Sequence, residues 1–107
     1  RMDHAYQRHR HWMRGKELDK TPSEYFREHI YFTFQDDYTA FQFKDYLNIE
    51  RMMWANDFPH SDSTWPWSQD LLAKNLTHMT EAEKNLILHE NVANLYKLDT
   101  AALQAVA

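Results

Sequence analysis

Residues Ile49–Ser68 read IERMMWANDFPHSDSTWPWS, and this stretch decides how the chain folds. The short apolar run Met52–Ala55 predicts a fully buried strand of about four to five residues, because it is apolar without polar alternation. Asn56 and Asp57 end the run, and Pro59 prevents a regular continuation. The stretch therefore predicts a buried strand that leads into a loop.

That loop places a carboxylate and an imidazole, Asp57 and His60, just beyond the strand. In barrels of alternating strands and helices, the carboxyl ends of the strands carry the catalytic side chains. Three large rings lie in the same loop, namely Phe58, Trp65 and Trp67. Rings of this size are costly to leave in water, so we expect the loop to fold over something.

A second strand is predicted upstream, over Glu28–Phe34, where apolar residues alternate with other β-forming residues. A predicted helix over Tyr38–Leu47 separates it from the strand at Met52–Ala55. Because such crossovers return parallel, we expect two neighbouring parallel strands. Asp36 and Asp37 lie in the turn between strand and helix, where either can cap the helix and Asp36 could instead contact a substrate.

The remaining periodic segments predict helices over Arg1–Met13, Asp70–Leu76 and Glu81–Tyr96. Thr80 and Glu83 have the spacing of a capping box, which begins the last of these helices. His9 and His11 are two residues apart in the first helix, so they point in different directions and do not form a metal-binding pair. No linker or second domain is visible, so residues 1–107 are predicted to form one helix-dominated domain.

Composition excludes several classes of function. The 107 residues are 43% hydrophobic and carry a formal net charge of −4 without a basic stripe, which argues against nucleic acid as a partner. No apolar run approaches the roughly 18 residues of a membrane span. The chain has no cysteine, which excludes disulfides and thiolate chemistry and is compatible with a cytoplasmic protein. We expect a soluble cytoplasmic protein without a nucleic-acid or membrane partner.

Three segments together resemble the amidohydrolase-related family, the metal-dependent hydrolases and decarboxylases of the aminocarboxymuconate-semialdehyde decarboxylase type. They read TPSEYFREHIYFTFQDD (21–37), MMWANDFPHSDSTWPWS (52–68) and ILHENVANLYKLD (87–99). The resemblance runs from Arg1 to about Asp99. Its most specific element is the D-x-P-H sequence of residues 57–60, because it follows a buried strand and precedes Trp-Pro.

The resemblance implies a (β/α)8 barrel with a metal at its mouth and, for the whole protein, a small-molecule substrate. The order of the matching segments implies the C-terminal part of that barrel, roughly the last two strand–helix units plus a terminal helix. Length agrees, because a complete barrel needs about 200 or more residues and this chain has 107. The function of the whole protein is therefore distinct from the behaviour of this piece.

Asp57 is the candidate catalytic residue. A metal-activated water needs a carboxylate beside it, which holds the metal, accepts the proton, or does both. Taken alone, Asp57 could equally be a turn or cap residue. The resemblance implies that it is the metal-binding, water-activating aspartate of the last strand. His60 could orient Asp57, contact the substrate or brace the loop, and Trp65 could cover the loop or contact the substrate.

The ligand set is incomplete within these residues. A catalytic zinc keeps three protein ligands and one open position, and the resembled family takes its other ligands from strands that this chain lacks. Zinc is that family's common ion, although Mn or Fe would use similar ligands. We therefore expect the chain alone to be inactive and either to self-associate or to need the missing strands.

Two other interpretations stay open from the sequence. The chain could be a standalone helical interaction module whose exposed aromatic side chains form a partner surface. It could also be a split or decayed enzyme piece without activity of its own.

Overall fold

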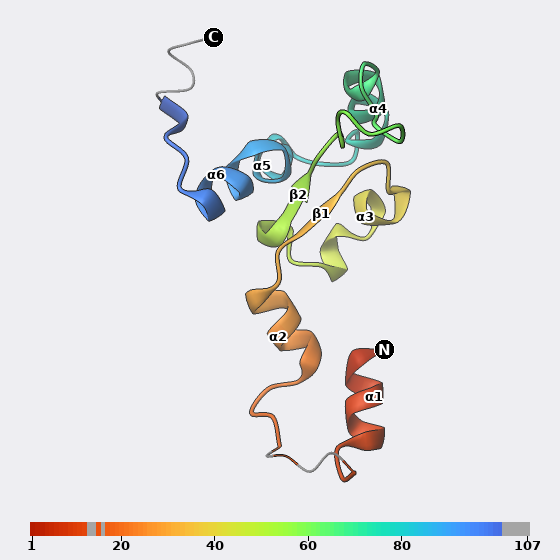
Figure 1. The fold of residues 1–107 in the computed structure, drawn as a ribbon, viewed down its shortest axis with the longest axis vertical. Helices are drawn as coiled ribbons and strands as arrows, with labels where there is room; N and C mark the ends of the chain where they lie inside the picture. The colour runs from red at the N-terminus through yellow and green to blue at the C-terminus, as the bar shows by residue number, and fades with distance from the viewer. Residues whose placement is uncertain (13–14, 16, 102–107) are drawn as a thin grey trace. The chain divides into compact units, whose positions relative to one another are not determined.

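A computed structural model describes residues 1–12, 15 and 17–101 of the chain. They belong to two compact units, Arg1–Ile30 and Tyr31–Ala107. The first unit contains helices α1 and α2, and the second contains both strands and helices α3 to α6 (Figure 1). Whether the two units act as one domain in the whole protein stays a prediction.

The first unit is a pair of helices, α1 (Met2–His9) and α2 (Pro22–His29). The carboxylate of Asp3 accepts hydrogen bonds from the backbone N–H and the hydroxyl of Ser23, at 2.8 and 2.6 Å, and these bonds join the helices. Helix α1 ends before the predicted limit, and the last predicted residue, Met13, lies outside the described residues.

The predicted strand over Glu28–Phe34 is wrong at its start, because Glu28 and His29 are the last residues of α2. A capping box starts this helix: the Thr21 backbone N–H donates to the carboxylate of Glu24 at 2.7 Å. Proline at the first helical position favours the same start. These signals at the start of α2 favour a helix, and the helix continues through Glu28 and His29, although the alternation of residues there favours a strand.

The two strands, β1 (Phe32–Phe34) and β2 (Met52–Trp54), form a parallel pair in which Phe32 lies opposite Met52. The prediction of neighbouring parallel strands is thus confirmed. Both strands end at the same edge of the sheet, so the segments that follow them lie close together (Figure 1).

The helix predicted over Tyr38–Leu47 is shorter than expected. Helix α3 covers Tyr38–Gln42, and a separate 3₁₀ turn follows at Lys44–Tyr46. A second 3₁₀ turn, Ile49–Arg51, leads directly into β2. The crossover between the strands is therefore a short helix and two turns.

Helix α4 (Ser68–Asn75) follows the loop after β2, in agreement with the predicted helix there. The predicted long helix over Glu81–Tyr96 is confirmed as a continuous run: α5 (Glu81–Asn85), a π-helical segment (Leu86–Glu90) and α6 (Asn91–Tyr96). Within the residues that the structure describes, no helix has the length and apolar character needed to cross a membrane.

The core of the second unit lies between the strands and the helices, and its buried members are Phe34, Phe41, Met52, Leu72, Leu76, Met79 and Ile87. Asn91 is a buried polar residue beside it. The Asn91 side-chain amide donates to the carbonyls of Ile49 and Met52, at 2.7 and 2.8 Å. This amide fixes the start of β2 against α6 and so helps to hold the strand that leads to the loop.

An ion pair between Lys44 and Glu83 joins the turn after α3 to the start of α5. The Lys44 ammonium lies 2.6 Å from the Glu83 carboxylate, and the two side chains are 13% and 26% exposed. This hydrogen bond, together with one from the Thr80 backbone N–H, lowers the pKa of Glu83 from 4.5 to about 2. Folding is therefore stabilised by ionised Glu83 above pH 4.5, and that stabilisation is lost as the pH falls from 4.5 to about 2.

Replacing Glu83 with Gln should remove this acid-sensitive part of the stability, while Gln still serves in the capping box with Thr80. Urea unfolding should show a steeper loss for the wild type than for Glu83→Gln between pH 4.5 and about 2. Glu81→Gln is the matched control, because Glu81 is 82% exposed in its 2.7 Å pair with Lys84 and such pairs contribute little. Parallel pH profiles for wild type and Glu83→Gln would contradict the assignment.

Candidate active site

The loop that follows β2 begins with a sharp turn at Asp57. Met52 and Met53 are buried, and the chain reaches the surface at Ala55 and Asn56. Asp57 has a φ of 59°, in the left-handed region that Asn and Asp tolerate better than other side chains. The turn places the Asp57 carboxylate at the carboxyl end of the strand.

Asn56 closes the loop at its base. The Asn56 carbonyl accepts hydrogen bonds from the Ser63 hydroxyl at 2.8 Å and from the Thr64 backbone N–H at 3.0 Å. The side-chain oxygen of Asn56 accepts from the Phe58 backbone N–H at 3.1 Å. Residues 56–64 therefore form a loop that local hydrogen bonds hold together.

Gln35 ties this loop to the end of the neighbouring strand β1. Its carbonyl accepts from the indole N–H of Trp54 at 3.0 Å, and its side-chain amide donates to the carbonyl of Asp62. Sequence reasoning missed Gln35, because its role depends on the register of two strands that lie nineteen residues apart at this contact. The only available signal was its place directly after a predicted strand.

Asp57 and His60 form a pair, as their spacing allows. Nδ1 of His60 lies 2.9 Å from Oδ1 of Asp57, and the His60 backbone N–H donates to the Asp57 carbonyl at 3.0 Å. The hydrogen bond to the carboxylate raises the pKa of His60 above its ordinary value. The side chains are 45% exposed for Asp57 and 75% exposed for His60, so both are accessible to other groups.

Asp57 lines a cavity of about 300 Å³ between the carboxyl ends of the two strands. The other lining residues are Thr33, Phe34, Gln35, Asp37 and Ala55. Asp57 thus lies close to the turn after β1, because parallel strands end at the same edge of the sheet.

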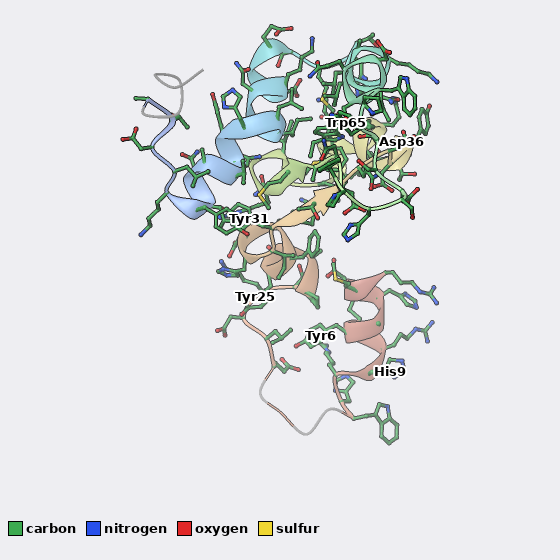
Figure 2. All side chains as sticks on the ribbon, turned by 45° about the horizontal axis from the view of Figure 1, so that its top comes forward. Tyr6, His9, Tyr25, Tyr31, Asp36 and Trp65 are labelled. Atoms are coloured by element: carbon green, nitrogen blue, oxygen red, sulfur yellow. The ribbon has the colours of Figure 1, made fainter. Side chains whose placement is uncertain are left out.

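The prediction that Asp36 or Asp37 begins the following helix is confirmed in position for Asp37, but not by a side-chain capping bond. Asp37 holds the N-cap position of α3 without a side-chain capping bond, and its carboxylate instead accepts from the Gln35 backbone N–H at 3.2 Å. Asp36 lines a separate hollow of about 700 Å³ beside α4. Asp36 and Trp65 both lie at the carboxyl ends of the strands, and Tyr31 lies at the opposite end (Figure 2). A substrate contact by Asp36 stays a prediction.

The aromatic side chains of the loop remain accessible. Phe58 and Trp65 contact each other edge to face, with ring centroids 5.6 Å apart, and are 63% and 58% exposed. Trp67 is also exposed. The expectation that the loop folds over something is wrong for the part of the chain that the structure describes.

The residues present can supply part of a metal site. Among the described residues, no group of three or more His, Cys, Asp or Glu side chains could hold a metal ion. Asp57 fits the role of a single oxygen ligand: His60 engages Oδ1, and no hydrogen bond within the described ranges engages Oδ2. A carboxylate oxygen is a suitable ligand for zinc and similar ions.

The chain belongs to the amidohydrolase family, whose model matches residues 2–98. Its structure is similar to the crystal structure of 5-carboxyvanillate decarboxylase LigW from Sphingomonas paucimobilis, with a TM-score of 0.74 at 21% sequence identity. The match covers 90% of this chain and 28% of the decarboxylase chain. No curated protein matches the sequence. The chain is thus a helix-dominated α/β structure that matches part of a barrel amidohydrolase, in a family that is typically metal-dependent.

Proposed function

We propose that this chain forms the last two strand–helix units and the terminal helix of a (β/α)8 barrel in a metal-dependent hydrolase or decarboxylase. Two findings support the proposal: the family match over residues 2–98 and the parallel pair of strands joined through α3. The match covers 28% of the decarboxylase chain. In this proposal, the other strands and the other metal ligands lie outside these 107 residues.

The observation that carries the proposal is the position of Asp57. Its carboxylate follows the carboxyl end of β2, lines a cavity there and is 45% exposed. Catalytic side chains of barrel enzymes occupy this end of the strands.

Asp57 has two roles in the proposed reaction. Its carboxylate would supply one oxygen ligand to a divalent ion, for which zinc is the first choice. It would also carry the proton of the reaction: it would accept one from the attacking water in a hydrolysis, or deliver one to the ring carbon that loses CO2 in a decarboxylation. When bound, such an ion lowers the pKa of a coordinated water toward neutrality. The hydrogen bond from His60 to Oδ1 leaves Oδ2 for these tasks.

The loop offers contacts for the substrate. The exposed edge-to-face pair of Phe58 and Trp65 can stack against a planar ring. The structural relative is a decarboxylase of 5-carboxyvanillate. We therefore propose aromatic carboxylates as the substrate class to test first.

Metal removal tests the proposal in the complete protein. Treatment with a chelator should abolish turnover of an aromatic carboxylate such as 5-carboxyvanillate, and addition of zinc should restore it, because the ion would bind and orient the oxygen atoms of the substrate. Metal content is measured on the same samples by elemental analysis. Full turnover by protein shown to be free of metal would refute the proposal.

A further inference from the structure

We propose that His60 is a positioning residue that acts through Asp57: its Nδ1–H holds Oδ1 of the carboxylate and leaves Oδ2 to the metal. This inference rests on the proposed function, because it takes Asp57 as a metal ligand. The sequence left three possible roles for His60, namely orienting Asp57, contacting the substrate or bracing the loop, and this inference selects the first.

Two hydrogen bonds join the residues at once. The His60 backbone N–H donates to the Asp57 carbonyl at 3.0 Å, and Nδ1 of the same residue lies 2.9 Å from Oδ1. The backbone bond closes a turn, and the left-handed conformation of Asp57 belongs to that turn. The carboxylate is therefore held both by its own backbone and by the imidazole.

The surrounding loop keeps the imidazole in place. Asn56 accepts hydrogen bonds from Ser63 and Thr64, which brings the two ends of the loop together. The Gln35 side chain donates to Asp62 and fixes the middle of the loop to the end of β1. His60 lies between these two attachments, so its position follows from bonds that do not involve its ring.

The exposure of the pair favours a functional role over a structural one. The side chains of Asp57 and His60 are 45% and 75% exposed, and exposed ion pairs contribute little to stability. The loss of a group that orients a metal ligand, by contrast, typically lowers metal affinity or activity by roughly 10- to 100-fold. Stability and function should therefore respond differently to the loss of the imidazole.

Substitutions in the complete protein separate these effects. Asn can place an amide N–H near the position of Nδ1, whereas Ala removes the donor. His60→Ala should lower kcat or metal affinity by roughly 10- to 100-fold and leave the melting temperature nearly unchanged. His60→Asn should recover most of the loss. His89→Ala is the control, because it removes an exposed imidazole from the π-helical segment, away from the loop.

Three results would overturn the inference: full kcat and full metal content in His60→Ala, a rise in KM alone, or equal losses in the Ala and Asn variants. The last two would indicate that His60 contacts the substrate through another atom. If His60→Ala does not fold, the Asn variant and the tautomer of His60 in the wild type still decide.

The tautomer of His60 gives a readout that does not depend on activity. In protein labelled with ¹⁵N-histidine, the neutral ring should carry its proton on Nδ1, and the His60→Asn spectrum identifies its signals. A proton on Nε2 alone would overturn the inference. Asp57→Asn separates the two proposals: an inactive Asp57→Asn beside a fully active His60→Ala would refute only the positioning role, whereas an active, fully metallated Asp57→Asn would refute both.

Discussion

Replacing Asp57 with Asn in the complete protein is expected to lower turnover by roughly 10²- to 10⁴-fold, the contribution of a positioned general base. Asn keeps the size of the side chain and an oxygen that can accept from His60, but it cannot take up the proton. Asn also tolerates the left-handed backbone at φ 59°, so the loop should keep its conformation. Steady-state kinetics on an aromatic carboxylate measure the effect.

The same substitution should barely change stability. Asp57 is held at an exposed turn and not in the core, so the melting temperature should stay near that of the wild type or rise slightly. If Asp57 were only a turn residue, Asp57→Asn would leave both turnover and stability intact, because Asn serves such positions as well as Asp. Turnover equal to the wild type would thus contradict the catalytic role.

Replacing Phe41 with Ala should have the largest effect on stability, a loss of about 3–5 kcal/mol in the free energy of unfolding. The Phe41 side chain is 0% exposed and packs edge to face on Phe34, with ring centroids 5.1 Å apart. Its removal leaves a cavity between α3 and β1. Urea-induced unfolding of the complete protein measures the change.

Phe43→Ala is the control for Phe41→Ala, because Phe43 directly follows α3 and is 49% exposed. Its substitution should cost much less, since little apolar surface is withdrawn from the core. Equal losses for the two variants would show that the packing between α3 and β1 is not what stabilises this part of the protein.

The strand at Met52 was predictable because its signal is local. A short apolar run that ends at Asn56 and Asp57, before Pro59, admits few other structures. The structure confirms a strand there, β2, which is shorter and less buried than predicted: it stops at Trp54 and leaves Ala55 exposed. The start of β1 was not predicted correctly. The alternating pattern of β1 extends upstream to Glu28 and His29 and so predicts a strand there. The capping box at Thr21 and Glu24 instead starts a helix that includes both residues.

In the candidate site, too, local contacts were predictable from the sequence and contacts between distant segments were not. Asp57 and His60 are three residues apart, so a single turn brings them together, and their pairing needs little beyond the local sequence. Gln35 and Asp37 reach the site through the register of β1 and β2, which no local pattern encodes. The proposed role of Asp57 at a metal could not be tested from local sequence either, because the described residues contain no group of three or more side chains that could hold the ion.

The amount of metal bound by Asp57→Asn tests the central claim most directly. An amide oxygen is a poorer ligand for a divalent ion than a carboxylate, so elemental analysis of the purified complete protein should find less metal per chain in the variant than in the wild type. The account predicts this deficit together with the loss of turnover in the same preparation. Full metal occupancy with retained turnover would contradict it and would remove Asp57 from the mechanism.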